Sequence, residues 1–396
     1  MKIFIANLGS TSFKYKLFDM SNGEVPYAVG NADRIGLPNG NWNLSSGSSG
    51  SAMTGEAQFK SHGDAIDFHL QLLQSESVIS GLGDIEAIGF KAVHGGPISG
   101  AVVVDDRVLG IMEEFSDVAP LHNPPYISAM KALQKLLPDT VQVAVFETSF
   151  HQSIPEKRQV YAIPYEWTEK LGIRRYGFHG ASHGYIGSRM KEIDDTLVRV
   201  ISCHLGGSSS ICAIEDGRSV ANSFGMTAQT GIPHAVRVGD FDPFSMLKLE
   251  AAGIDREVIW QKLGKESGLL GMSGISSDLH DIEQAAGDGN ERALLTIDVL
   301  VESIRFYVGA YLTVLGGADA LCFTGGIGQY SDIIRRKVVE GLDYAGVILD
   351  QGKNQKADGR LESRIDGLAG QVQIWILPTN EELIVARQVM HVLNKK

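Results

Sequence analysis

The chain has 396 residues, of which 43% are hydrophobic, and a formal net charge of −12 from 35 Lys and Arg against 47 Asp and Glu. This length predicts about two to three domains, each with enough apolar residues for its own core. The acidic balance argues against nucleic-acid and anionic-membrane partners, because both call for a basic surface. Met1 leads directly into a strand pattern and no apolar run is long enough to span a membrane, so we expect a cytoplasmic protein.

Two short segments rich in glycine and serine occur in the two halves of the chain. The first is Asn7–Lys14 (NLGSTSFK), and the second, 197 residues later, is His204–Ile211 (HLGGSSSI). Each lies between apolar runs and predicts a strand, a tight turn and a second strand. Gly and Ser let backbone N–H groups and hydroxyls approach an anion closely, so such turns are typical of phosphate sites. One such turn alone is more often an ordinary hairpin, but the repetition favours two lobes that bind a phosphoryl group from opposite sides.

The rest of the chain alternates strand and helix patterns. Strands are predicted over 87–93 and 141–146, and Asn123 before two prolines predicts the N-cap of a helix that Pro138 ends. Further predicted elements are a helix over 293–315, a strand over 320–323, a helix opened by Ser331, a strand over 373–377 and a last helix with the capping box Thr379–Glu382. This order predicts an α/β protein of two similar lobes with a central cleft.

Two further features are interpreted as structural. The serine-rich segment Asn39–Gly55 is expected to be a mobile surface hairpin or loop. Cys203, Cys212 and Cys322 lie in apolar strand-like runs, so we expect buried free thiols rather than disulfides or metal ligands.

A set of motifs runs from end to end of the chain: Asn7–Lys14, Val93–Gly96, Ala119–Pro124, Val145–Gln152, Arg174–Gly180, Gly239–Pro243, Lys265–Gly271, Phe323–Gly328 and Pro378–Leu383. Together, and in this order, they resemble the motifs of acetate kinases. The resemblance implies two duplicated actin-like (ribonuclease H-like) lobes, as in sugar kinases and Hsp70, and a homodimer. It places the N-terminal lobe at 1–147 plus 383–396 and the nucleotide-binding lobe at 148–382.

The resemblance also implies a reaction. This is the reversible transfer of the ATP γ-phosphoryl group to acetate or a similar short-chain carboxylate, which gives an acyl phosphate and ADP and depends on Mg²⁺ or Mn²⁺. Such transfer needs positioning and charge neutralisation more than covalent chemistry. The implied catalytic residues are Lys91, His122, Glu147, His179 and Arg237, and the implied metal-site residues are Asn7 and Glu381.

Nucleotide and phosphate contacts are implied for Ser10, Ser12, Lys14, His204, Gly206, Gly207, Ser208, Asp278, His280, Gly326 and Ile327. The methyl group of the acid would lie against Val93, Leu121, Phe178 and Ala228. Each role has a plainer alternative. A single histidine such as His122 or His179 is more often a core or turn residue, and Arg237 has a surface ion pair with Asp240 or Asp242 as its alternative.

Several of the residues implied to be catalytic or to bind substrate or nucleotide differ from the family pattern. Lys91 stands where the family has Arg, and Glu147 where it has Asp, so a bidentate donor is replaced by a point charge and a carboxylate is one methylene longer. Gly207 replaces Asn, His280 replaces Arg, and Ala228 replaces Pro. These changes leave open a different donor such as pyrophosphate, a larger acid, or a noncatalytic actin-like nucleotide-binding module. The family residues that persist argue against the noncatalytic module, namely Asn7, His122, His179, Arg237 and Glu381.

Overall fold

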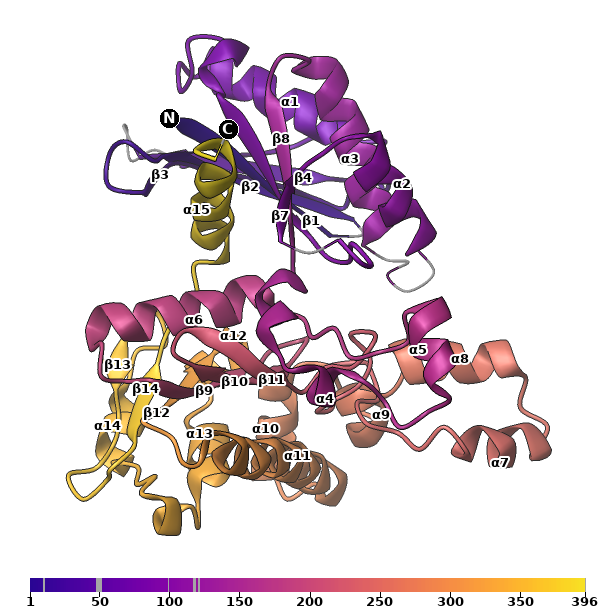
Figure 1. The fold of residues 1–396 in the computed structure, drawn as a ribbon, viewed down its shortest axis with the longest axis vertical. Helices are drawn as coiled ribbons and strands as arrows, with labels where there is room; N and C mark the ends of the chain where they lie inside the picture. The colour runs from indigo at the N-terminus through magenta and orange to yellow at the C-terminus, as the bar shows by residue number, and fades with distance from the viewer. Residues whose placement is uncertain (10, 48–51, 99, 117–118, 120–121, 396) are drawn as a thin grey trace. The chain divides into compact units, whose positions relative to one another are not determined.

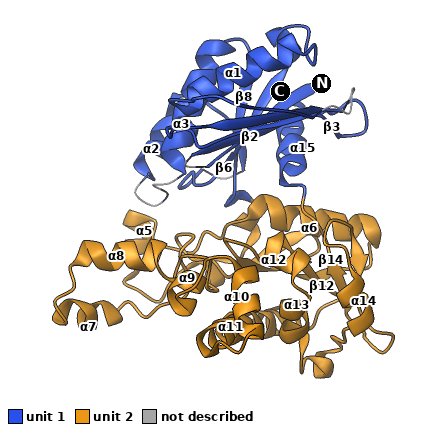
Figure 2. Cartoon of the chain, turned by 180° about the vertical axis from the view of Figure 1, so that it is seen from behind, with its two compact units in different colours: residues 1–149, 380–396 blue, residues 150–379 orange. Residues whose placement is uncertain are grey.

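The structure is a computed structural model that describes residues 1–9, 11–47, 52–98, 100–116, 119 and 122–395. It consists of two compact units, coloured separately in Figure 2: unit 1 is Met1–Ser149 with Asn380–Lys396, and unit 2 is Phe150–Thr379. Two predicted site residues, Ser10 and Leu121, lie outside the described residues. Residues 380–382 belong to unit 1 rather than to the second lobe as predicted, because the helix that starts there packs on the sheet of unit 1.

Unit 1 is built on one mixed sheet with the strand order β5-β4-β3-β2-β1-β6-β8-β7. Its strands are β1 (Lys2–Leu8), β2 (Ser12–Asp19), β3 (Val25–Asp33), β4 (Asn41–Ser46), β5 (Ala52–Glu56), β6 (Ala87–Ala92), β7 (Ala101–Val103) and β8 (Val141–Phe146). β1, β6 and β8 are parallel, whereas β2 returns antiparallel to β1. β4 and β5 pair within the segment expected to be a hairpin or loop.

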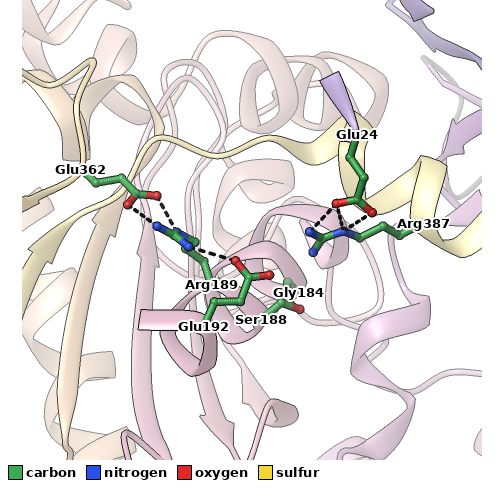
Figure 3. A network of polar contacts seen from close by, with 7 residues as sticks. All are labelled: Glu24, Gly184, Ser188, Arg189, Glu192, Glu362 and Arg387. Atoms are coloured by element: carbon green, nitrogen blue, oxygen red, sulfur yellow. Dashed lines mark hydrogen bonds and ion pairs between the residues drawn. The ribbon is translucent and has the colours of Figure 1, made fainter. Parts of the chain in front are cut away.

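Helices cover both faces of this sheet (Figure 1). α1 (His62–Ser75), α2 (Asp106–Glu114) and α3 (Asn123–Leu136) pack on one face, and α15 (Glu381–Leu393) packs on the other. Gly89 in β6 permits the close approach of α15, since a Cβ there would lie 2.8 Å from Val389. Arg387 of α15 also forms an ion pair with Glu24 at 2.8 Å, which Figure 3 shows.

Unit 2 repeats the central arrangement of unit 1. Its sheet order is β11-β10-β9-β12-β14-β13, from β9 (Arg199–His204), β10 (Ser210–Glu215), β11 (Arg218–Asn222), β12 (Ala320–Thr324), β13 (Ser363–Arg364) and β14 (Gln373–Ile376). The series β10-β9-β12-β14 matches β2-β1-β6-β8, with an antiparallel hairpin followed by two parallel neighbours. The predicted duplication is therefore confirmed.

The helices of unit 2 also lie on both faces of its sheet. They are α4 (Glu156–Gln159), α5 (Tyr165–Leu171), α6 (Gly180–Ile193), α7 (Ser245–Ala251), α8 (Arg256–Lys265), α9 (Gly268–Ser273), α10 (Leu279–Gly287), α11 (Glu291–Leu315), α12 (Gly325–Tyr330), α13 (Asp332–Val339) and α14 (Gln351–Lys356). α6 packs on one face and α11 on the other. Arg189 of α6 binds Glu192 and Glu362 (Figure 3). The three cysteines are buried and free, as predicted.

The helix ends confirm some predictions and correct others. Ser331 is the N-cap of α13, as predicted, and its hydroxyl accepts a hydrogen bond from the backbone N–H of Ile334. The N-cap of α3 is His122, one residue before the predicted Asn123, which is the first helical residue beside the prolines. The capping box at Thr379 is wrong, because α15 begins at Glu381 with Asn380 as its N-cap. Among the described residues, none of the helices combines the length and apolar character needed to cross a bilayer.

Candidate active site

Charged and polar side chains of unit 1 lie together at the carboxyl ends of its parallel strands. Asn7 is near the end of β1, Lys91 near the end of β6, and Glu147 directly follows β8. The first turn of α15 brings Glu381 and Glu382 to the same edge. We call these five residues with Lys16 the acid–lysine cluster.

Lys91 is the cation of this cluster that contacts two carboxylates. Its Nζ is 3.4 Å from Glu147 Oε1 and also forms an ion pair with Glu381. Burial alone would lower the pKa of Lys91, but the attraction of Glu381 and Glu147 outweighs it and holds the pKa well above its usual value. Lys91 is therefore protonated at neutral pH. The structure thus brings together three predicted site residues that are far apart in sequence.

Lys16 and Glu382 form a second ion pair in the cluster, with 3.0 Å between Nζ and Oε2. Lys16 also donates to Asn380 Oδ1 at 3.2 Å, and Glu382 accepts from the Asn7 amide at 3.5 Å. The pairing occupies Glu382, which explains why that side chain does not close a capping box. Both residues are absent from the predicted site. The sequence does hold one signal for Lys16, namely its position two residues after Lys14. Alternate residues of a strand lie on the same face of a sheet, so Lys16 is expected on the face of Lys14.

The side chain of Asn7 forms a hydrogen bond with a buried tyrosine, Tyr126. The Tyr126 hydroxyl donates to Asn7 Oδ1 at 3.3 Å and accepts from the backbone N–H of Leu8 at 3.0 Å. Burial raises the pKa of Tyr126, so the hydroxyl keeps its hydrogen and acts as a donor. Tyr126 is thus a further member of the site that carries no sequence signal of its own.

The first glycine-rich turn connects β1 to β2 beside this cluster. The Gly9 N–H donates to the Ser12 carbonyl at 2.9 Å, and a Cβ at Gly9 would lie 2.5 Å from Ser12 Oγ. Lys14 faces Asn7 in the strand register, and its side chain is exposed. Gly9 therefore leaves room for the Ser12 hydroxyl close to the backbone, which is compatible with the interpretation of a phosphate-binding turn.

His122 and Val93 also belong to unit 1, and Val93 directly follows β6. His122 caps the N-terminus of α3, and the next residue, Asn123, is fully buried and donates to the carbonyls of His94 and Met112 at 3.0 and 2.9 Å. Val93 is half-buried against the core of unit 1. The buried Asn123 amide anchors the segment that carries His122.

The second glycine-rich turn lies in unit 2, next to the glycine-rich segment at the start of α12. Ser209 Oγ accepts from the Gly206 N–H at 2.9 Å, which closes the turn after β9. The Leu205 carbonyl accepts from the Ile327 N–H at 2.9 Å, so the turn contacts the start of α12. The exposed Gly326 has no atom within 4 Å of the position of a Cβ. The structure thereby brings together Gly206, Gly207, Ser208, Gly326 and Ile327.

His179 has a left-handed backbone, φ 56° and ψ 34°, at the N-cap of α6. This conformation is uncommon for a residue with a Cβ and is enriched at functional sites. The His179 ring lies 4.2 Å, centroid to centroid, from the ring of His204 and 5.2 Å from that of Phe224. His179 Nδ1 is 2.8 Å from Ser210 Oγ, and His204 Nδ1 is 2.7 Å from Ser182 Oγ.

Arg237 is a largely buried cation whose guanidinium donates to the Ala228 carbonyl. Burial lowers the pKa of Arg237 to about 10, so it stays charged at neutral pH. Asp240 instead accepts from the Gly231 N–H and Tyr307, and Asp242 from the Phe244 N–H. Within the described ranges neither aspartate forms an ion pair with Arg237, so the surface ion-pair alternative is wrong.

The remaining predicted residues occupy two places in unit 2. Phe178 is buried and packs edge-to-face on Phe224 at 5.6 Å. Asp278 is the N-cap of α10 and accepts from the His280 N–H at 3.0 Å; both side chains are exposed. Asp278 therefore has a structural role that stands beside its predicted contact with the nucleoside.

The side chains of the acid–lysine cluster offer few ligands for a metal ion. Over the part of the chain that the structure describes, no group of three or more His, Cys, Asp or Glu side chains is arranged to hold a metal ion. Mg²⁺ differs from other metals in that it is commonly bound by one or two carboxylates plus substrate phosphates. Glu381 supplies one carboxylate and Asn7 one amide oxygen at the same sheet edge, which are donor types that this lighter requirement names.

Comparisons with known proteins agree over the whole length. The chain matches the acetokinase family over residues 2–387. An acetate kinase from Dictyoglomus turgidum is 41% identical over 403 aligned positions, which cover 100% of this chain and 98% of the relative. The crystal structure of acetate kinase from Porphyromonas gingivalis matches with a TM-score of 0.90 and 38% identity over 99% of both chains. That of a propionate kinase from Francisella tularensis matches with a TM-score of 0.89 and 32% identity over 98% of both chains.

These likenesses confirm the predicted actin-like fold and the resemblance read from the motifs. The chain therefore belongs to the acetokinase family.

Proposed function

We propose that the protein transfers the γ-phosphoryl group of ATP to acetate or a similar short-chain carboxylate, reversibly and in the cytoplasm. The observation that carries this proposal is the contact between the turns of Gly206 and Gly326 in unit 2. Glycine-rich turns at the carboxyl ends of β9 and β12 offer backbone N–H groups to phosphates, and the open space at Gly326 leaves room for a nucleoside.

In the proposed reaction a carboxylate oxygen of the acid attacks the γ-phosphorus. The new oxygen–phosphorus bond forms as the bond to the β-phosphate oxygen breaks, so ADP leaves with its electron pair and the acyl phosphate remains. Arg237 and His179 are proposed to donate hydrogen bonds to the transferred group, and His122 to assist them. A charged guanidinium with few competing partners suits this role, because preorganised donors stabilise developing charge.

Mg²⁺ is the proposed cofactor, with Mn²⁺ as a substitute, held by Glu381 and Asn7 together with the nucleotide phosphates. When bound, the ion neutralises phosphate charge and orients the nucleotide. Lys91 is proposed to hold the carboxylates of Glu381 and Glu147 in place. Its attraction to both groups supports this role.

The proposed acid pocket uses Val93, Phe178 and Ala228, with Leu121. Ala228 is smaller than the proline typical of the family, so we infer a deeper pocket that accepts propionate as well as acetate. The match to a propionate kinase is consistent with this inference.

Trapping of the acyl phosphate as its hydroxamate tests the function. Initial rates with a series of carboxylates against ATP, GTP and pyrophosphate would identify both substrates. We expect ATP- and Mg²⁺-dependent product, and a loss of about 100- to 1000-fold in kcat for Arg237→Ala and Glu381→Ala. A folded protein that binds ATP but phosphorylates no acid would support the noncatalytic module, and activity with pyrophosphate alone would change the donor.

We also propose a homodimer, formed through unit 2. Large apolar side chains are exposed on α7 and α8 and just before them, including Phe244 at 75%, Leu247 at 63% and Trp260 at 61%. They flank an apolar groove of about 410 Å³ between these helices. Monomers rarely expose such a patch without a partner. Light scattering after size exclusion should give a dimer for the wild type and a monomer for Trp260→Lys.

A further inference from the structure

The hydroxyl of Ser210 lies between two histidine rings in unit 2. Its Oγ atom is 2.8 Å from His179 Nδ1 and 2.8 Å from His183 Nε2. On the other side of the His183 ring, Nδ1 is 2.9 Å from Ser202 Oγ. His183, Ser202 and Ser210 are all 0% exposed. A continuous chain of hydrogen bonds thus runs from the sheet interior to His179.

Few hydrogen atoms are available to form this series of hydrogen bonds. A hydroxyl has one hydrogen, so Ser210 donates to one ring and must accept an N–H from the other. His183 is neutral, because burial and then the nearby rings of His151 and His204 keep its pKa well below the usual value. A neutral ring has one N–H, so the side on which His183 carries it decides what Ser210 offers to His179.

For a neutral His179 ring, two arrangements satisfy every bond. In the first, His183 donates from Nε2 to Ser210, and Ser210 donates to Nδ1 of His179. The single N–H of a neutral His179 is then on Nε2. In the second, all donors are reversed and Nε2 of His179 is left with a lone pair. An anionic phosphoryl oxygen attracts a donor and repels a lone pair, so it selects the first arrangement.

We propose that Ser210 and His183 are positioning residues that set the hydrogen of His179 on Nε2, where it donates to the transferred phosphoryl group. The proposal rests on the proposed function, since it assumes that His179 contacts this group. The left-handed backbone of His179 and its packing on His204 and Phe224 fix the ring itself. The hydroxyl chain therefore has the separate task of choosing the tautomer.

The closing experiment reads the tautomer and the kinetics separately. Two-bond ¹H–¹⁵N spectra of protein labelled at histidine, with Mg²⁺ and a non-hydrolysable ATP analogue bound so that a γ-phosphoryl group is present, assign each ring nitrogen, and His179→Gln identifies the His179 signals. We expect His179 to carry its hydrogen on Nε2 in the wild type and to populate the Nδ1–H form in Ser210→Ala. A wild-type His179 with its hydrogen on Nδ1 would overturn the proposal, even if the enzyme is active.

The kinetic half uses a matched control. Ser210→Ala should lower kcat for acyl phosphate by about 10- to 100-fold, as loss of a group that orients an active-site histidine commonly does, with little change in either KM. Ser210→Thr keeps a hydroxyl and should restore most of kcat. Ser219→Ala removes another buried contact to a histidine, 2.8 Å from His151, and should leave kcat unchanged. Equal losses in Ser210→Ala and Ser219→Ala would show a merely structural role, and absence of any acyl kinase activity would sink the function without affecting the tautomer result.

Discussion

Lys16 and Glu382 form an ion pair of 3.0 Å that joins β2 to the first turn of α15. Burial would raise the pKa of Glu382, but the attraction of Lys16 and then Lys91 outweighs it and lowers the pKa below its usual value. A carboxyl group with a lowered pKa in the folded state stabilises the fold above its unfolded pKa, and this contribution is lost as the pH falls through the folded value.

Lys16→Met should therefore destabilise the protein near neutral pH by about 1 to 3 kcal/mol, in the range for hydrogen bonds to charged groups. The difference from the wild type should begin to shrink near the ordinary pKa of glutamate, about 4.3, because the unfolded chain takes up the proton there, and should vanish below the lowered pKa of the folded state, where Glu382 is neutral. Urea unfolding at several pH values measures both effects. Lys14→Met, on the same strand face but exposed, is the matched control and should change stability little. A difference that is constant with pH would contradict the role of Glu382.

Lys91 and Glu147 should be coupled. Glu147→Asp shortens the side chain that contacts Lys91 at 3.4 Å, and Lys91→Arg lengthens the cation, so each change alone should reduce kcat/KM or do little. The double variant should have a higher kcat/KM than the combined effects of the two single variants predict, since residues in one charge network couple by about 0.5 to 3 kcal/mol. A double-mutant cycle on kcat/KM measures this. Strict additivity would show that the two residues changed independently.

The choice of acid should respond to Ala228. A pocket one methylene deeper contributes about 0.8 kcal/mol, or about fourfold in binding, for propionate over acetate. Ala228→Pro should move preference back toward acetate. The carbonyl that accepts from Arg237 is kept in this variant, so catalysis should survive. The ratio of kcat/KM for the two acids is the measurement, and a strong wild-type preference for acetate that Ala228→Pro leaves unchanged would exclude the deeper pocket.

Two adjacent glycines should behave differently. Gly325 has φ +73°, and a Cβ there would lie 2.5 Å from the Leu205 carbonyl, so Gly325→Ala should unfold at lower urea. Gly326→Ala meets nothing within 4 Å and should be as stable as the wild type. Gly326→Leu should raise KM for ATP by about tenfold, because it fills the space proposed for the nucleoside, a change of about 1.4 kcal/mol. An unchanged KM for ATP would place the nucleoside elsewhere.

The fold could be predicted well from the sequence because the central hairpin of each sheet has a recognisable local sequence pattern. Apolar runs beside Gly9 and Gly206 predicted the paired hairpins, and the structure has both. The pairing of Glu382 with Lys16 does not follow from the sequence alone, since the spacing of Lys14 and Lys16 predicts only a shared strand face and not which carboxylate Lys16 contacts. The contacts of Ser210 with two rings are equally hidden, because they join β10 to α6 through tertiary packing alone.

The insertion of unit 2 within unit 1 has a consequence for biosynthesis. Lys91 and its partner Glu381 are 290 residues apart, and Asn7 and Glu382 are 375 apart. A nascent chain that has already made the first sheet still exposes Ile5 and Gly89, which α15 covers, and it lacks Glu382 beside Lys16 and Glu381 beside Lys91. Closure of so long a loop is a late step, so the apolar face must be shielded from other chains until α15 emerges from the ribosome. Glu381, the carboxylate proposed to bind metal, thus arrives last, and the protein gains its proposed activity only when synthesis has passed through α15.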